Sequence, residues 1–325
     1  MHHRRALNKT VKDLKRQAKN ADQHTTSITL PSVSLGDLRR RFKHIHEPLH
    51  PAVLRQVLSY RRIAPDPHRR LMIYGSDGGL LVARSRLNNP EAIANLFKSI
   101  QDLPPTKERR NRGIYRGDYD ARHYGVWASY SKTTFNTREM KDDKSSAPAF
   151  IEQNRIIFHR LSQFLGEVSP RSFKEYKLYP ISPGTERLFG AFLACVINNG
   201  GNSPDETKPH RDVREAIYGY SGLISCGDYT GGALILYDLK IIIEMEPGDM
   251  VIFPDSLIHH SNEPAIGNRC SVVAFTQENV YDYWHRTYGM TLRRQGRYGG
   301  KTHKVKEKIK QKVKELKDKW RAQKK

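Results

Sequence analysis

Two histidines and one aspartate are spaced so that they could bind a single metal ion. His210 and Asp212 lie two residues apart, and on a strand such residues project from the same face. The adjacent histidines His259 and His260 follow about fifty residues later, and because neighbours on a strand face opposite ways, only one of them can join the site. Two imidazoles and one carboxylate on one side of a metal form the facial triad of non-haem Fe(II) oxygenases.

A second pair of polar residues could bind an organic acid beside that metal. Arg269 and Ser271 follow His260 by nine and eleven positions. An arginine offers a planar fork that matches a carboxylate, and a serine adds a hydroxyl donor. The pair suits the distal carboxylate of 2-oxoglutarate, so the sequence predicts Fe(II), 2-oxoglutarate and O2 as cofactor and cosubstrates.

Glycine and proline mark the turns between these residues. Gly231-Gly232 precedes the apolar run 233–237, and Pro247-Gly248-Asp249 precedes the run 250–253. Adjacent glycines allow close backbone approach, and Pro-Gly-Asp supplies a tight turn. A His-x-Asp pair alone is usually a surface pair. The same pair followed in order by Gly-Gly, Pro-Gly-Asp, a second His and Arg-x-Ser strongly indicates a metal site.

Short β-type runs must position these residues. From residue 188 onward, apolar runs alternate with Gly, Pro and Asp, at 188–197, 222–226, 233–237, 240–245, 250–253, 257–260 and 269–276. Many short strands at this spacing predict an antiparallel sandwich or barrel.

The chain before residue 188 is predicted to be mixed. Apolar spacing predicts helical structure within 35–65 and amphipathic helices at 89–100 and 150–165. The runs 71–74 and 80–83 flank a Gly-rich turn, which predicts a hairpin.

On these motifs the sequence resembles the Fe(II)/2-oxoglutarate dioxygenases, and within them the TET/JBP-like oxygenases of fungi. The close likeness spans 196–277, where an Asn precedes the His-x-Asp, a strand follows Gly-Gly, and the distal histidine precedes Arg-x-Ser. A looser similarity covers roughly 110–285. The resemblance implies an α+β fold, a double-stranded β-helix (jelly roll) core flanked by helices. It also implies oxidation of the methyl group of 5-methylcytosine, or of another methylated base, in nucleic acid.

The same resemblance assigns roles to individual residues. It favours His260 over His259, because His-Ser-Asn and the following Glu-Pro are similar to the family's distal-histidine strand. The implied catalytic metal ligands are His210, Asp212 and His260. The implied cosubstrate-binding residues are Arg269, Ser271 and Asn198, although Asn198 could instead be a turn residue beside Gly200-Gly201.

The positive charge lies mainly outside the predicted barrel. The chain has 56 Lys and Arg against 34 Asp and Glu, a net charge of +22. Residues 1–23 carry +5 and residues 286–325 carry +13, whereas 190–285 carries −8. Three basic runs outside an acidic core, the third at 107–116, predict a nucleic-acid partner, and the resemblance favours DNA.

Arginine and aromatic residues interleave from Arg112 to Trp127. Such a segment suits nucleic-acid contact, because cations meet phosphates and rings stack on bases. An equal alternative is a loop whose aromatic residues pack on the core. Further along, the stripe from Val305 to Trp320 predicts a lysine-rich amphipathic helix.

We predict three parts: a basic N-terminal arm at 1–30, a dioxygenase domain at 31–285 with its barrel core at about 188–285, and a basic helical tail at 286–325. No apolar run approaches twenty residues, and the N-terminus has no apolar leader. Three widely spaced cysteines fit a reducing compartment. We therefore expect no membrane contact and a nuclear location.

Two alternatives to base oxidation are open. The same triad could serve a protein side-chain hydroxylase of this superfamily. The domain could also be catalytically degenerate and act as a nucleic-acid-binding module. The oligomeric state is open as well.

Overall fold

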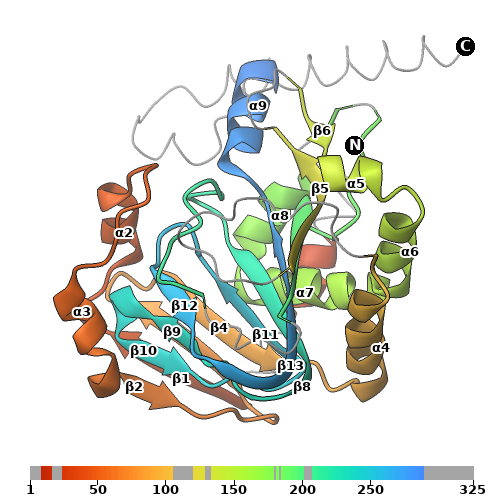
Figure 1. Ribbon diagram of the computed structural model, residues 1–325. Helices are drawn as coiled ribbons and strands as arrows, with labels where there is room; N and C mark the ends of the chain where they lie inside the picture. The colour runs from red at the N-terminus through yellow and green to blue at the C-terminus, as the bar shows by residue number, and fades with distance from the viewer. Residues whose placement is uncertain are drawn as a thin grey trace, which may run out of the picture.

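The computed structural model describes residues 9–16, 24–104, 120–128, 133–178, 181–182, 184–200 and 207–288. Within these residues two β-sheets form the centre of the molecule (Figure 1). The larger sheet has the order β1-β3-β4-β11-β8-β13-β7-β5-β6, and the smaller sheet has the order β12-β9-β10-β2.

Most strands of both sheets are short, as the sequence predicts, but two strands of the larger sheet have 11 residues each. Those of the larger sheet are β1 (Thr25–Leu30), β3 (Arg70–Gly75), β4 (Leu80–Arg86), β11 (Asp249–Phe253), β8 (Ser221–Gly231), β13 (Ala265–Phe275), β7 (Ala194–Asn199), β5 (Asp120–Trp127) and β6 (Phe135–Asn136). Those of the smaller sheet are β12 (His260–Asn262), β9 (Leu234–Leu236), β10 (Ile241–Ile243) and β2 (Arg61–Ile63).

Strand β13 shows how side-chain alternation divides the two faces of the larger sheet. It pairs antiparallel with β8 and with β7 along its length. Cys270, Val272 and Ala274 point to the outer face and pack in the main hydrophobic core. Ser271 and Val273 point the other way, toward the smaller sheet, because successive side chains on a strand face opposite sides.

Helices cover the outer face of the larger sheet. They are α4 (Pro90–Gln101), α6 (Ser146–Gln153), α7 (Arg155–Val168) and α8 (Pro170–Leu178), and in Figure 1 they lie to the right of the sheets and behind them. Their apolar stripes supply buried residues such as Leu96, Phe150 and Leu161 to the core. Two sheets with helices on one side form the expected α+β fold, a double-stranded β-helix flanked by helices.

The remaining helices lie outside this layer. They are α2 (Leu35–Arg41), α3 (Pro51–Arg55), η2 (Val57–Ser59), α5 (Arg138–Asp142), η3 (Tyr237–Leu239) and α9 (Glu278–Tyr288). None of the helices in the described residues is long and apolar enough to span a membrane.

The predicted elements of the first half are found with local differences. The hairpin is confirmed as β3 and β4, and the helix at 89–100 is confirmed as α4, capped by Asn89. The helix expected at 150–165 is interrupted at Asn154, whose side-chain amide donates to the Phe150 carbonyl and to Ser99 Oγ. The segment 35–65 holds only short helices and ends in β2.

The sheets take strands from far outside 188–285. Strand β1, inside the predicted arm, pairs in parallel with β3, and Leu14 of the helix at 9–16 is buried in the core. Helix α9 crosses the predicted limit at residue 285. The proposed limits of the three parts stay predictions, and the basic run at 107–116 and the helix predicted from Val305 to Trp320 lie outside the described residues.

Candidate metal centre

Backbone pairing brings the two predicted histidine ligands together. His210 and His260 form an antiparallel bridge with reciprocal hydrogen bonds of 3.0 and 2.8 Å. Their ring centroids lie 4.5 Å apart. Asp212 follows on the same face, with its Oδ2 3.6 Å from Nε2 of His260. One ligand atom from each of these three residues lies within 4.8 Å of the other two, and no other such group occurs in the described part of the chain.

Both imidazoles are oriented by the backbone. Nδ1 of His210 lies 2.7 Å from the Lys208 carbonyl, and Nδ1 of His260 lies 2.9 Å from the Ile258 carbonyl. A carbonyl can only accept, so Nδ1 carries a proton in each ring and Nε2 is the nitrogen left to bind a metal. A metal-binding histidine usually donates its other ring N–H to an acceptor such as a backbone carbonyl. The donor set of two imidazoles and one carboxylate fits Fe(II).

Two carboxyl groups, the partly exposed Asp212 and the buried Asp255, bring negative charge together at the site. Burial acts to lower the pKa of His260, but the hydrogen bond and the charge of Asp212 outweigh it and raise the pKa. Burial, followed by the charge of Asp212, raises the pKa of Asp255 to about 7. A divalent cation at the three residues would offset this concentration of negative charge.

His259 points away from this cluster. Its Nδ1 lies 3.0 Å from Oδ2 of Asp238, and its Nε2 lies 3.3 Å from the Glu47 carbonyl. The alternation expected from the sequence therefore holds, and the structure brings His260 rather than His259 to His210 and Asp212.

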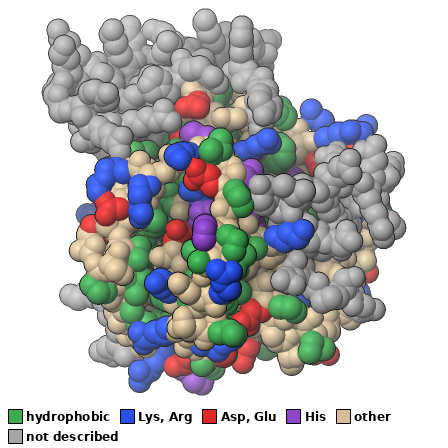
Figure 2. Space-filling view, turned by 60° about the vertical axis from the view of Figure 1, so that its left-hand side comes forward, with side chains coloured by type: hydrophobic (Ala, Val, Ile, Leu, Met, Phe, Trp, Pro, Cys, Tyr) green, Lys and Arg blue, Asp and Glu red, His purple; other side chains and the backbone are tan. Residues whose placement is uncertain are grey.

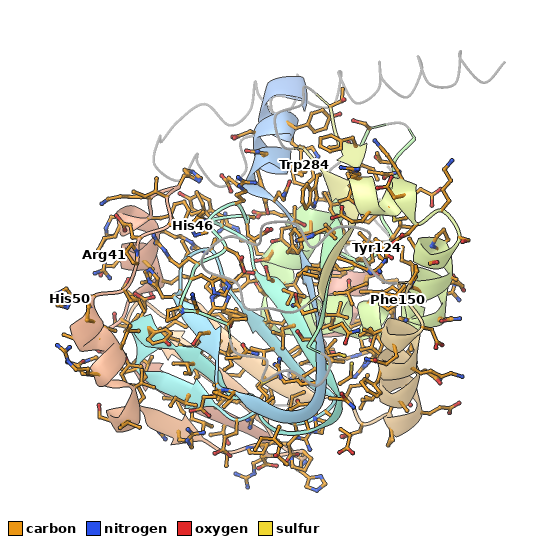
Figure 3. All side chains as sticks on the ribbon, viewed as in Figure 1. Arg41, His46, His50, Tyr124, Phe150 and Trp284 are labelled. Carbon is orange, nitrogen blue, oxygen red and sulfur yellow. The ribbon has the colours of Figure 1, made fainter. Side chains whose placement is uncertain are left out.

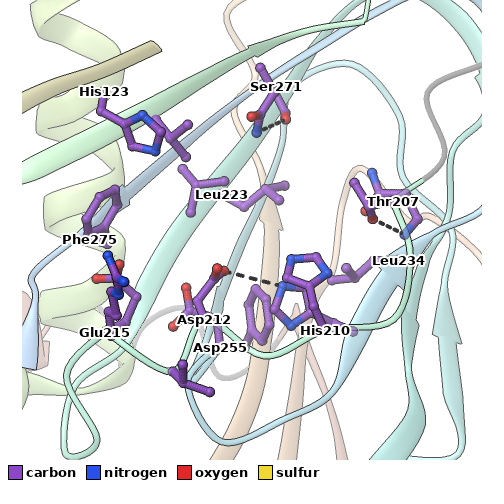
Figure 4. Close-up of a pocket in the computed structure, with 18 of the residues that line it drawn as sticks. His123, Thr207, His210, Asp212, Glu215, Leu223, Leu234, Asp255, Ser271 and Phe275 are labelled. Carbon is purple, nitrogen blue, oxygen red and sulfur yellow. Dashed lines mark hydrogen bonds and ion pairs between the residues drawn. The ribbon is translucent and has the colours of Figure 1, made fainter. Parts of the chain in front are cut away.

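The cluster lies in a cavity of about 360 Å³ between the two sheets. Figure 4 shows Asp212 near its middle, with His123, Phe275 and Glu215 to one side and Thr207 and Leu234 to the other. Every site residue expected from the sequence lines this cavity, namely His210, Asp212, His260, Arg269, Ser271 and Asn198. Arg214, two residues after Asp212, also lines it.

Arg269 is almost fully buried at the cavity wall. Its guanidinium lies 5.6 Å above the Tyr229 ring, and the Asn262 amide, with its oxygen turned toward the arginine, accepts from both terminal nitrogens at 2.8 and 2.9 Å. Gly232 packs directly on the arginine stem, and a Cβ there would lie 2.7 Å from Cδ of Arg269. The close approach expected of the double glycine thus serves to position this arginine.

Asn198 lies beside the predicted anchor. On adjacent strands it faces Ser271, and its Nδ2 donates to Ser271 Oγ at 3.2 Å. Its Oδ1 is buried and has no hydrogen-bond partner in the described structure. Asn198 lies within strand β7 and not in a turn, and its role at the cosubstrate stays a prediction.

A segment before α3 closes one side of the cavity. Arg211 stacks on Phe42 at 5.5 Å and reaches Glu47 at 3.6 Å, and His44 Nδ1 lies 3.4 Å from the Val213 carbonyl. His46 lines the cavity, and Figure 3 shows it on the same side of the molecule as Arg41.

Several cavity residues could not be predicted from the sequence. Asn262 belongs to the His-Ser-Asn motif, but its contact with Arg269 depends on strand pairing in the folded chain, and Asp255 lies in a turn that carries no motif. Trp127 and His123 lie on β5, in a segment for which nucleic-acid contact and packing were equal alternatives. Tyr124 of this segment is fully buried in the core, whereas His123 and Trp127 line the cavity. Nucleic-acid contact by this segment stays a prediction.

Comparison with known proteins supports the fold. No protein-family model matches the sequence, and no curated protein matches it. NgTET1, solved in complex with 5mC DNA, has a TM-score of 0.53 at 15% identity, over 70% of this chain and 91% of that chain.

Two further solved structures match with TM-scores below 0.5. OsALKBH1 has a TM-score of 0.36 at 14% identity, over 60% of this chain and 96% of that one. A viral collagen prolyl hydroxylase from Paramecium Bursaria Chlorella virus-1 has a TM-score of 0.35 at 11% identity, over 61% and 96%. The chain has the fold of the Fe(II)/2-oxoglutarate oxygenases.

Proposed function

We propose that the protein is an Fe(II)/2-oxoglutarate-dependent dioxygenase that oxidises the methyl group of 5-methylcytosine, or of another methylated base, in nucleic acid. The observation that carries the enzyme class is the cluster of His210, Asp212 and His260 in a cavity that also holds a buried arginine. With O2, the bound iron and 2-oxoglutarate supply an oxidant for a C–H bond, and 2-oxoglutarate leaves as succinate and CO2.

The chain contributes binding and orientation. His210, Asp212 and His260 would hold the metal, and their donor set of two imidazoles and one carboxylate fits Fe(II). Arg269 receives the distal carboxylate of 2-oxoglutarate through its planar fork, assisted by Ser271. Gly232 and Tyr229 hold that guanidinium in place, so the cosubstrate is bound in one orientation.

The choice of a nucleic-acid substrate has three supports. One structural neighbour was solved with 5mC DNA, and the sequence resembles TET/JBP-like oxygenases. The net charge of +22 favours a polyanionic partner. A base inside a duplex cannot reach a cavity between two sheets, so the protein must flip the base out or act on a single strand.

Mass spectrometry of the product tests this function. The purified chain is incubated with Fe(II), 2-oxoglutarate, O2 and methylated DNA, and the digested DNA is analysed for 5-hydroxymethylcytosine. We expect the oxidised base with the wild type and none with Asp212→Ala. Succinate formation without an oxidised base on methylated DNA or RNA would refute the substrate and retain the enzyme class.

The protein side-chain hydroxylase is the second candidate, because the same triad serves it. If it is correct, a peptide screen yields a product mass increased by one oxygen while methylated nucleic acids yield none. If the domain is instead a catalytically degenerate nucleic-acid-binding module, we expect neither product and no Fe(II) binding.

A further inference from the structure

The cavity wall continues onto strand β5, beyond the residues assigned so far. Side chains alternate along this strand: Tyr124 and Val126 are fully buried in hydrophobic clusters, whereas His123 and Trp127 line the cavity. The rings of His123 and Trp127 meet edge to face, with centroids 5.4 Å apart. His123 Nδ1 also lies 3.9 Å from a carboxylate oxygen of Glu139.

The indole of Trp127 has an unsatisfied hydrogen-bond donor. Its ring packs against the apolar cluster that contains Val196 and Phe275. Its Nε1 is buried, yet it has no hydrogen-bond partner in the described structure. Buried indole N–H groups normally find a partner, so a donor left over on a cavity wall points to an acceptor on a ligand.

Trp127 and the cosubstrate anchor lie at different ends of the cavity. Asn198, beside Ser271, pairs with Ala121 at the start of β5, and Trp127 lies six residues further along, at the other end of the same strand. In Figure 4, His123 and Phe275 lie on the opposite side of Asp212 from Thr207 and Leu234. The Trp127 end is therefore free for the substrate when 2-oxoglutarate occupies the Arg269 end.

We propose that Trp127 and His123 are specificity-determining residues for a planar, acceptor-bearing ring. The indole N–H of Trp127 donates to a carbonyl oxygen or ring nitrogen of the substrate base, and the rings of Trp127, His123 and Phe275 form the apolar wall on which that base lies. This inference rests on the proposed function and names the residues that read the base, since flipped bases are recognised by stacking and by hydrogen bonds to their edges.

The variant Trp127→Phe tests the inference, because it keeps an aromatic ring and removes the N–H. Binding is measured by fluorescence anisotropy, without O2 and with Fe(II) and 2-oxoglutarate present. Two single-stranded oligonucleotides are compared, one with a 5-methylcytosine and one with an abasic residue at that position. The variant should bind the methylcytosine strand about tenfold more weakly and the abasic strand as the wild type does, with the affinity for 2-oxoglutarate unchanged.

Trp284→Phe is the matched control, since Trp284 is fully buried away from the cavity lining. It should lower the thermal stability and leave the preference for methylcytosine over the abasic residue intact. Equal loss on both strands in Trp127→Phe, or no loss on either, would overturn the inference. A wild type that binds both strands equally would instead refute base recognition altogether, and with it the proposed substrate.

Discussion

At the residue scale, the candidate site depends on one backbone pairing. His210 and His260 are fifty residues apart in the chain and exchange two backbone hydrogen bonds. This bridge brings the imidazoles into contact and places Asp212 within reach of both. Carbonyl groups then orient each ring through Nδ1. The site is thus organised by the strands before any metal binds.

Gly232 provides the sharpest test of how the cosubstrate arginine is held. A methyl group at Gly232 would lie 2.7 and 2.8 Å from Cδ and Nε of Arg269, so Gly232→Ala must displace the guanidinium. We expect the KM for 2-oxoglutarate to rise about tenfold, the loss of roughly one charge-assisted hydrogen bond.

Gly78→Ala is the matched control for that variant. Gly78 has a similar positive φ of 70° against 65°, but a Cβ there meets open space. Gly78→Ala should lower the free energy of unfolding about as much as Gly232→Ala does, because both positions need a left-handed backbone. It should leave the KM for 2-oxoglutarate unchanged. An equal rise of KM in both variants would mean that backbone strain, not the contact with Arg269, causes the effect.

The buried carboxyl of Asp255 predicts a pH-dependent stability. Its pKa of about 7 in the folded chain exceeds the ordinary value near 3.9, so the folded state holds an extra proton between these values. The free energy of unfolding of the metal-free protein should therefore fall as the pH rises from about 4 to 7. Melting temperatures at pH 5 and pH 8 should diverge less in Asp255→Asn than in the wild type, and an identical pH dependence would refute this assignment.

The chemistry of the site could be predicted from the sequence because it depends on residue type and spacing. His-x-Asp and Arg-x-Ser each place two side chains on one face of a strand, which needs no tertiary information. Asn262 and Trp127 could not be assigned in this way. Each acquires its role only when its strand pairs with another that is distant in sequence.

At the element scale, the segment at 34–47, here called the N-terminal segment, connects the larger sheet to one side of the cavity. Helix α2 begins beside the β3–β4 turn, where Asp77 accepts hydrogen bonds from the backbone of Leu35, Gly36 and Gly79 and from Ser34 Oγ. Beyond α2, Phe42 and Glu47 contact Arg211, which lies between His210 and Asp212. His44 lies beside the carbonyl of Val213, the residue after Asp212. One turn of the larger sheet therefore anchors the segment that closes the cavity.

Removing the Asp77 carboxylate should loosen this segment. Burial acts to raise the pKa of Asp77, but the hydrogen bonds from Gly36, Gly79, Ser34 and Leu35 lower it to about 2. The stabilisation is thus present above the ordinary pKa and lost as the pH falls toward 2. Asp77→Ala should reduce the free energy of unfolding by about 1 to 2 kcal/mol at pH 7, measured by urea denaturation. A difference from wild type that persists undiminished near pH 2 would contradict this account.

The periodic patterns predicted the kind of element better than its ends. The helix at 89–100 has a capping Asn89 and a Pro90 that define its start. The pattern at 150–165 contains no comparable signal, and the interruption at Asn154 depends on a hydrogen bond to Ser99 of another helix. Strand β1 has too few apolar residues to be recognised alone and is defined by its pairing with β3.

At the scale of the whole molecule, strands from both halves of the chain build the two sheets. The sequence located the barrel near its C-terminal part because the apolar runs are dense there. Strands β1, β3, β4 and β5 were harder to recognise as parts of the same sheet as the C-terminal strands, since the register that joins them is long-range. Figure 2 shows that Lys, Arg and His side chains gather on the face where the N-terminal segment lies, with acidic side chains among them.

The exposed basic side chains of the N-terminal segment predict that nucleic-acid binding weakens as the salt concentration rises. Arg40, Arg41 and Lys43 are exposed beside the cavity-lining His46. Replacing these three with Ala should weaken binding of a single-stranded oligonucleotide and reduce the slope of log K against log salt by about 2, since each phosphate contact contributes about 0.7.

The matched control removes the same charge from the helical side. Arg155, Arg160 and Arg171 are exposed on α7 and α8, the layer on the outer face of the larger sheet. Their replacement should change the slope by much less. Equal changes in both triple variants would show that only the total charge matters, not its position beside the cavity.

The neighbouring histidines offer the most direct test of the central claim, that His210, Asp212 and His260 form an iron centre. The measurement is Fe(II)- and 2-oxoglutarate-dependent succinate formation by His260→Ala and His259→Ala, with Fe(II) binding titrated anaerobically in both. The account predicts that His260→Ala loses turnover and binds Fe(II) far more weakly, whereas His259→Ala keeps both, because His259 faces Asp238. Retained turnover in His260→Ala, or loss in His259→Ala alone, would contradict it.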